Sequence, residues 1–453
     1  MSLRSKALVN LFNGWPNPSL LPPELVKAAA GAVLSDESMA LSILQYGPDQ
    51  GYESLRDEIA RWLTAFYKPQ DAIQADRICI TGGASQNLAC ILQTFTDPLY
   101  TRNIWMVAPT YYLACRIFED SGFAGRLRSV PEDEEGIDLD VLSRQIAHSE
   151  EKAQAEGNLA PKLKASRPWR RIYRHVIYAV PTFANPSGRI MTIGRRERLV
   201  RIARRFDALV VTDDVYDFLQ WPSSSPSTST EDHFPDQAYV PRIIDVDRYL
   251  DGGPAETFGN AISNGSFSKI VAPGCRTGWA EGTKALAYGL SQTGTSRSGG
   301  CPSQLVASYI YQLLASNTLQ KHVLCTLQPA YSRRYHTMMA AIMQQLLPLG
   351  VSTPQANADV AGGYFIWLKL PEPLTSKVIT RKAAEEQVLS ISEGNAFQVQ
   401  GDEASGLSFQ SHIRLCFSYE TEDNLVEGVE RLARLIKREL ESSHPHCSLG
   451  LGT

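Results

Sequence analysis

A strand–helix–strand pattern near the middle of the chain constrains its fold most strongly. Residues 208–211 form an apolar run that predicts a buried strand ending at Asp213. An earlier β-type run, residues 176–180, leads into the polar loop Asn185-Pro-Ser-Gly. Residues 195–206 lie between the two runs and have the spacing of an amphipathic crossover helix, as two neighbouring parallel strands require. The pattern predicts an α/β fold with a mostly parallel sheet.

Polar residues at the end of the second predicted strand indicate a ligand site. In open α/β sheets, ligands bind at the carboxyl ends of the strands, where Asp213 is expected. A carboxylate there can keep a pyridine nitrogen protonated, which makes the ring an electron sink. Tyr216, in the turn that follows, can hydrogen-bond the phenolic oxygen of the same ring. Taken alone, these residues are equally compatible with an Asp-rich turn.

The segment Gly265-Ser-Phe-Ser-Lys-Ile-Val-Ala-Pro-Gly-Cys-Arg contains a lysine, two hydroxyls and an arginine in one short loop. The amine of Lys269 can condense with an aldehyde as a Schiff base, while Ser266, Ser268 and Arg276 hold a phosphate dianion. The chemistry suits a phosphorylated aldehyde cofactor. A solvated loop is the alternative interpretation of this segment alone.

A glycine turn offers a second half for the phosphate site. Residues 80–86 read Ile-Thr-Gly-Gly-Ala-Ser-Gln and run into an apolar helix predicted over residues 86–96. Free N–H groups at such a turn bind anions, and Ser85 and Gln86 stand at the helix start. Further helices are predicted over residues 23–34 and 52–67.

These motifs, in this order, resemble the fold-type-I enzymes that depend on pyridoxal 5′-phosphate (PLP). Within that group the chain resembles class I/II aminotransferases, in the branch of 2-aminoadipate, kynurenine and aromatic amino-acid aminotransferases. The resemblance runs from about residue 13 to about residue 434. It implies a large domain with a mostly parallel sheet of the seven-stranded type and a smaller α+β domain. We expect an N-terminal arm and part of the small domain in residues 1–45, the large PLP-binding domain in 46–315, and the small C-terminal domain in 316–453.

The resemblance also implies roles for the cofactor-binding residues. Lys269 forms the Schiff base, Asp213 pairs with the pyridine nitrogen, and Asn185 and Tyr216 contact the phenolic oxygen. Tyr111 stacks on the ring, with Tyr112 as the alternative. The phosphate ligands implied are Ser85, Gln86, Ser266, Ser268 and Arg276.

Three further residues are assigned by the same resemblance to the substrate and to a second protomer. Arg414, in the alternating run of residues 412–419, grips the substrate carboxylate with a bidentate fork. Gly14, in an N-terminal Gly-Trp-Pro segment, lines the substrate pocket together with Asn185. Tyr46 reaches the phosphate of the partner protomer, which implies a homodimer with shared active sites. A surface arginine on an edge strand is the alternative for Arg414.

Composition and charge exclude several other classes of function. The formal net charge of −4 gives no electrostatic reason to expect nucleic acid or an anionic membrane as a partner. No apolar run reaches the roughly 18 residues of a membrane span. The eight cysteines are scattered, without the clustering of a metal site, which predicts reduced thiols, a cytoplasmic protein and no metal.

Two segments depart from the regular alternation of strands and helices. Residues 148–171 are polar, and they end in a basic cluster at 167–171 that predicts an insertion on the surface of the large domain. Residues 222–238 contain a run of Ser, Thr and Pro that predicts a flexible loop near the strand bearing Asp213.

The predicted activity is the transfer of an amino group from an L-amino acid to a 2-oxo acid such as 2-oxoglutarate, in two half-reactions. A PLP-dependent lyase or a carbon–carbon bond-forming enzyme of the same fold is the main alternative. A transcriptional regulator would need a DNA-binding module ahead of Gly14, and an inactive binding protein would not need the set Lys269, Asp213 and Arg414. The aromatic residues Trp15, Tyr111 and Tyr112 favour a donor with a large or flat side chain.

Overall fold

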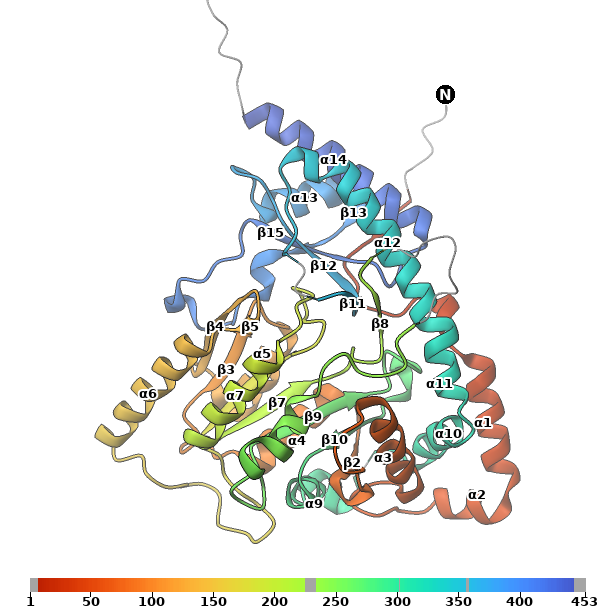
Figure 1. Cartoon of the computed structure of the whole chain (residues 1–453), viewed down its shortest axis with the longest axis vertical. Helices are drawn as coiled ribbons and strands as arrows, with labels where there is room; N and C mark the ends of the chain where they lie inside the picture. Colours follow the sequence, from red (N-terminus) through yellow and green to blue (C-terminus); the bar gives the residue numbers. More distant parts are fainter. Residues whose placement is uncertain (1–6, 225–233, 301, 356–357, 444–453) are drawn as a thin grey trace, which may run out of the picture.

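The computed structural model describes residues 7–224, 234–300, 302–355 and 358–443. Its main element is a sheet of eight strands, in which helices cover both faces (Figure 1). The strand order is β2 (Ile78–Thr81), β10 (Gly278–Glu281), β9 (Ala261–Ser266), β7 (Ala208–Asp213), β6 (His175–Ala179), β3 (Ile104–Ala108), β4 (Leu127–Asp133) and β5 (Gly136–Ile137). The strands from β9 to β4 are parallel, whereas β10 and the two-residue β5 run antiparallel to their neighbours. The predicted α/β class is confirmed, and the sheet has the seven expected strands plus the short β5.

The central strands are apolar on both faces because each face packs against helices. Side chains alternate along a strand, so Ile177 and Val210 face one layer, and Tyr178 and Val211 face the other. The first layer contains α6 (Leu139–Ala155), α7 (Ile193–Arg205) and α8 (Ile243–Tyr249). The second contains α4 (Ala84–Phe95), α5 (Leu113–Phe118) and α9 (Lys284–Ser291).

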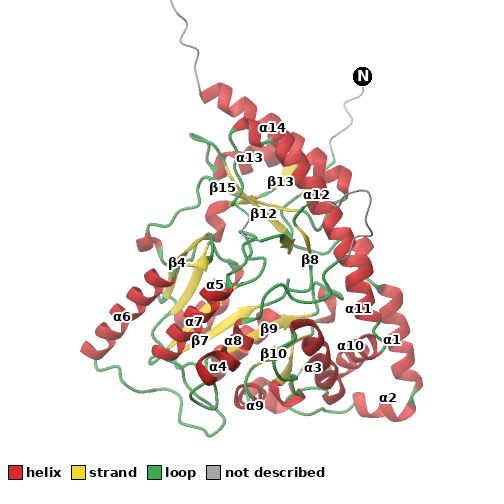
Figure 2. Cartoon of the chain, viewed as in Figure 1, coloured by secondary structure: helices red, strands yellow, loops and turns green. Residues whose placement is uncertain are grey.

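A smaller sheet lies above the large one in the view of Figure 1 and is covered by long helices (Figure 2). Its strand order is β12 (Phe365–Lys369), β15 (His412–Cys416) and β14 (Ser392–Glu393). The helices that pack with it are α12 (Gln328–Gln345), α13 (Ser376–Gln387) and α14 (Glu422–Ser443). The N-terminal strand β1 (Val9–Asn10) pairs with β13 (Leu389–Ser390), which places the start of the chain beside its C-terminal part. The domain boundaries near residues 45 and 315 remain predictions.

The remaining elements connect these two parts. Strand β8 (Gln220–Pro222) pairs with β11 (Val360–Gly362) and so links the loop after β7 to the smaller sheet. The other helices are α1 (Pro23–Ser35), α2 (Glu37–Ile43), α3 (Glu53–Tyr67), α10 (Gln304–Ala315) and α11 (Thr318–His322). The four predicted helices correspond to α1, α3, α4 and α7, with ends that differ by at most about two residues, the usual uncertainty of helix ends.

The prediction of a surface insertion over residues 148–171 is wrong for its first part. Helix α6 continues to Ala155, because Ser149 and Ala153 are buried on the face that packs against the sheet. Only residues 156–171 leave the regular structure. Most of the Ser/Thr/Pro run lies outside the described residues, since these exclude 225–233. Among the described helices, none is long and apolar enough to cross a membrane.

Candidate active site

The predicted site residues gather at one edge of the large sheet. Asp213 is the last residue of β7, and Ser266 is the last residue of the neighbouring strand β9. Asn185 lies in the loop that follows β6, on the other side of β7. The carboxyl ends of three parallel strands therefore bring together segments that are far apart in sequence, as expected for this class of sheet.

Lys269 lies in a largely enclosed position beside the N-terminal segment and two aromatic rings. Its Nζ donates a hydrogen bond to the carbonyl oxygen of Gly14 at 2.8 Å. The same atom lies 5.1 Å from the centre of the Tyr364 ring and 5.9 Å from that of Tyr216. Burial lowers the pKa of Lys269 to about 8, because the charged ammonium is poorly solvated there. A useful fraction of the amine is therefore neutral near pH 7 and able to act as a nucleophile or base.

Asp213 is buried and uses only one of its two carboxylate oxygens. Oδ2 accepts a hydrogen bond from the Tyr178 hydroxyl at 3.0 Å, while Oδ1 has no partner among the described residues. Burial, with a smaller contribution from the charge of the neighbouring Asp214, raises the pKa of Asp213 to about 7. A buried, unpaired carboxylate oxygen is costly unless a donor meets it. Oδ1 is thus suited to accept a hydrogen bond from a protonated ring nitrogen.

The loop after β9 and the glycine turn before α4 form an anion cradle around Arg276. The guanidinium donates through Nη1 to Ser268 Oγ at 3.2 Å and through Nη2 to the Gly82 carbonyl at 3.0 Å. The backbone N–H of Ser268 donates to Ser266 Oγ at 3.2 Å, so both hydroxyls lie beside the arginine. Gly83 has a φ of +95°, and a Cβ added there would lie 2.6 Å from Arg276 Nη2. Only glycine permits this close approach.

The two predicted phosphate ligands of α4 occupy its exposed first turn. Ser85 and Gln86 are both exposed at the helix N-terminus, where free N–H groups and the helix dipole favour an anion. The Gln86 side chain, however, accepts from the Gly82 N–H at 3.0 Å and donates to Cys90 Sγ at 3.0 Å. Gln86 therefore braces the glycine turn, and its part in phosphate binding remains a prediction.

Arg414 lies on the central strand of the smaller sheet and is buried. Its Nη1 donates to Asn185 Oδ1 at 3.0 Å, and its Nη2 donates to the Phe12 carbonyl at 2.8 Å and to Ser392 Oγ at 3.1 Å. The guanidinium carbon lies 4.0 Å from the centre of the Phe365 ring, and Nε has no partner among the described residues. This placement excludes a surface arginine on an edge strand. In the part of the chain that the structure describes, no carboxylate accepts a hydrogen bond from Arg414, so the buried cation is suited to an anionic ligand.

The aromatic residues of the site differ in their exposure. Tyr111 is mostly buried, and burial followed by the charge of Asp213 raises its pKa to about 12. Tyr112 packs edge-on against Phe397, with 5.5 Å between the ring centres, so its ring belongs to a packed cluster. Tyr46 is 87% exposed.

Several residues that the sequence did not indicate contact the predicted set. Tyr178 was assigned only to the apolar strand, yet its hydroxyl binds Asp213. A tyrosine in a fully buried strand needs a partner for its hydroxyl, and this was the available signal. Phe12 and Ser392 contact Arg414 through long-range packing, for which the sequence carries no local sign. Among the described residues, no group of three or more His, Cys, Asp or Glu is arranged to hold a metal ion.

Comparison with known proteins places this geometry in a family. The family model described as "Aminotransferase class I and II" matches residues 10–432. The chain is 29% identical to aromatic-amino-acid aminotransferase 1 of Thermococcus litoralis, over 96% of this chain and 89% of the relative. It is 27% identical to 2-aminoadipate transaminase of Thermus thermophilus, over 95% and 90% of the two chains. A kynurenine aminotransferase of Pyrococcus horikoshii, solved with PMP, superposes with a TM-score of 0.74 at 28% identity, covering 96% and 92%.

The chain belongs to the class I and II aminotransferases. It is a PLP-dependent aminotransferase of fold type I, and the site geometry fits that cofactor. The unpaired Oδ1 of Asp213 suits the ring nitrogen, and the cradle around Arg276 suits the phosphate. Lys269, whose Nζ binds the Gly14 carbonyl, is the amine suited to the cofactor aldehyde.

Proposed function

We propose that the amino donor is an L-amino acid with a long or flat side chain and that the acceptor is a 2-oxo acid such as 2-oxoglutarate. The observation that carries this proposal is the environment of Arg414, whose guanidinium carbon lies 4.0 Å from the Phe365 ring centre and 4.8 Å from that of Phe397. A carboxylate bound there enters a pocket walled by aromatic rings, which favour flat or extended apolar groups. The relatives named for aromatic amino acids, 2-aminoadipate and kynurenine support the same class of donor.

Each residue of the site has a separate role in the proposed reaction. Bound PLP supplies an electron sink for the charge that develops when a proton leaves the substrate Cα. Asp213 keeps the ring nitrogen protonated, because its unpaired oxygen lies in a poorly solvated place where a cationic partner is strongly favoured. Arg414 and Asn185 hold the substrate carboxylate, and the neutral amine of Lys269 takes and returns the proton.

A donor panel without any acceptor tests this function. Phenylalanine, tyrosine and 2-aminoadipate should each convert the bound cofactor to pyridoxamine phosphate in a single turnover, followed by absorbance and by mass spectrometry. Alanine and aspartate serve as small comparators, and we expect them to react about tenfold or more slowly, as a few missing apolar contacts imply. Cofactor that stays in its aldehyde form while a donor is consumed would indicate a lyase. Faster reaction with alanine would contradict only the proposed donor class.

Arg414→Lys should weaken both half-reactions without loss of cofactor. Lysine is a point charge and cannot form the two parallel hydrogen bonds of a guanidinium fork. One hydrogen bond to a charged group contributes about 1.5–3 kcal/mol, so KM for the donor and for the oxo acid should rise roughly ten- to a hundredfold. Arg431→Lys, at a buried arginine of α14 that binds backbone carbonyls, is the matched control and should leave both constants unchanged. An effect on one half-reaction only would mean that Arg414 is not a shared anchor.

A homodimer and a cytoplasmic location are also part of the proposal. Tyr46 is 87% exposed, and Leu41 and Leu44 beside it are 63% and 65% exposed, so this edge carries apolar side chains suited to an interface. The expected contact of Tyr46 with the phosphate of a partner protomer accounts for a tyrosine in that position. Light scattering that shows a monomer at micromolar concentration would contradict the dimer. The cytoplasmic location is supported only by the scattered arrangement of the cysteines. Finding the tagged protein exclusively inside an organelle or outside the cell would contradict it.

A further inference from the structure

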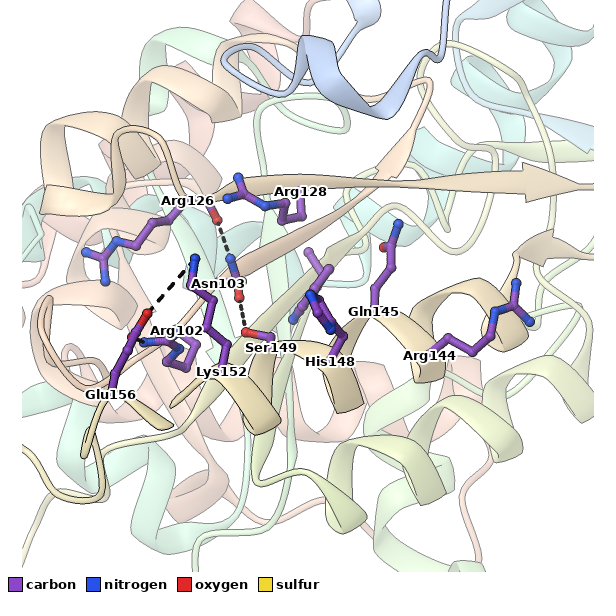
Figure 3. A pocket seen from close by; sticks show the side chains of 11 residues that line it. Arg102, Asn103, Arg126, Arg128, Arg144, Gln145, His148, Ser149, Lys152 and Glu156 are labelled. Carbon is purple, nitrogen blue, oxygen red and sulfur yellow. Dashed lines mark hydrogen bonds and ion pairs between the residues drawn. The ribbon is translucent and has the colours of Figure 1, made fainter. Parts of the chain in front are cut away.

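A second cleft lies on the large domain, at the opposite end of the strands from the active site. It has a volume of about 710 Å³ and opens between α6 and the first residues of β3 and β4 (Figure 3). Strand β3 leads from Trp105 in this cleft to Ala108, which precedes the loop bearing Tyr111. Its charged and polar lining includes Arg102, Arg126, Arg128, Gln145, Lys152 and Glu156.

Positive charge is concentrated in this cleft although the whole chain carries a formal net charge of −4. Four arginines and one lysine line it, whereas Glu156 is its only acidic lining residue in the described part of the chain. Glu156 forms ion pairs with two of these cations: its Oε2 lies 2.7 Å from Arg102 Nη1, and its Oε1 lies 4.0 Å from Lys152 Nζ. Like charges held together in this way repel each other unless an anion joins them.

Arg126, just before β4, and Arg128, within β4, donate to backbone carbonyls and form no ion pair with a carboxylate in the described part of the chain. Arg126 donates to the carbonyls of Thr101 and Gly122, and Arg128 donates to those of Gly125 and Leu127. Burial, together with the charge of Arg102, lowers the pKa of Arg126. The guanidinium groups are therefore fixed in place and oriented in advance, which reduces the entropy lost when a ligand binds.

The helix side of the cleft adds polar groups that face the strand. Figure 3 shows Gln145 and Lys152 extending from α6 toward β4. Gln145 Oε1 is buried and has no hydrogen-bond partner among the described residues. Rotation of this amide about its last bond would place two N–H donors at that point. Asn103 and Ser149 bind each other at 2.6 Å, so these two side chains already satisfy one another.

We propose that this cleft binds a small molecule that carries two or more phosphoryl or carboxylate groups. Arg128 and Lys152 hold the anionic groups from opposite walls. Gln145 donates a hydrogen bond from α6, and the positive charge of Arg126 strengthens the attraction. Guanidinium forks match the planar geometry of carboxylate and phosphate oxygens. The cleft is walled on two sides, and its volume lies within the range of roughly 300–1,000 Å³ typical of small-molecule sites, which favours a compact ligand over a protein segment.

Calorimetric titration of the PLP-loaded enzyme with inorganic pyrophosphate and, separately, with citrate tests the proposal. Bound PLP occupies the phosphate cradle at Arg276, so that cradle does not compete for the probe, and the cleft variants distinguish binding in the cleft from binding of citrate at Arg414. The double variant Arg128→Gln/Lys152→Gln should weaken binding about tenfold or more, as the loss of charged hydrogen bonds implies. Arg434→Gln/Lys437→Gln removes the same two charges from the exposed face of α14 and should bind like the wild type.

Each outcome of this experiment decides the proposal. Equal weakening by both double variants would mean unspecific attraction, and unchanged binding by the cleft variant would place the anion elsewhere. Absence of binding to pyrophosphate and citrate, with binding of an acidic peptide, would overturn the small ligand in favour of a protein contact. The single variant Lys152→Gln, at a side chain that is 66% exposed, keeps the test valid if Arg128→Gln impairs folding, and it should weaken binding in the same direction.

Discussion

Replacing Lys269 by alanine is expected to abolish turnover and the covalent attachment of PLP together. In the proposed reaction the amine of Lys269 both forms the Schiff base and moves the proton of the substrate. Loss of general acid–base catalysis alone costs up to about 10⁴-fold in rate, so we expect a loss of roughly that size or more. The measurements are single-turnover kinetics with a good donor and the mass of the protein after borohydride reduction.

Lys284→Ala is the matched control for this experiment. Lys284 lies at the start of α9, and its side chain is 69% exposed and forms an ion pair with Asp76. Its environment therefore differs from the enclosed position of Lys269. It should keep full activity and the added mass of one cofactor. If Lys269→Ala still carries PLP that borohydride fixes to another lysine, the assignment of Lys269 is wrong.

Asp213→Asn should retain PLP but lose about two or more orders of magnitude in rate. We expect phosphate contacts around Arg276 to dominate the affinity for the cofactor, and this substitution does not alter them. A neutral amide cannot hold the ring nitrogen protonated, so the charge that develops on the ring loses its stabilisation in a poorly solvated site. The measurements are the bound PLP content and kcat for the first half-reaction.

Tyr178→Phe separates the charge of Asp213 from its positioning. The variant keeps the carboxylate and removes one hydrogen bond of 3.0 Å, so its loss of rate should be about tenfold, well below that of Asp213→Asn. Near-normal turnover in Asp213→Asn would assign the role of the electrostatic partner elsewhere. An equally large loss in Tyr178→Phe would indicate that the orientation of the carboxylate matters more than its charge.

The sequence was most informative where function and local structure coincide. Asp213 ends a run of apolar residues, and Asn185 follows a similar run, so the topology of parallel strands was enough to predict that both lie at the same edge of the sheet. The cluster of Ser266, Ser268 and Arg276 is local in sequence, and the structure brings these side chains together. The prediction of a surface insertion is wrong for residues 148–155 because a polar composition is also compatible with a helix, and the buried positions of α6 recur at helical spacing.

Contacts between residues far apart in the sequence could be identified only from the structure. Arg414 and Asn185 are 229 residues apart, and nothing local to either residue indicates their hydrogen bond at 3.0 Å. The cationic cleft likewise joins side chains of β4 and α6 whose charges are unremarkable in sequence, because only the packing of α6 on the sheet places them opposite each other. By itself the sequence determined the α/β class, the family and the chemical groups of the site, since these depend on periodic patterns and short motifs. The tertiary structure alone decided which groups are buried, paired or left unpaired, because burial and partners arise from the packing of distant segments.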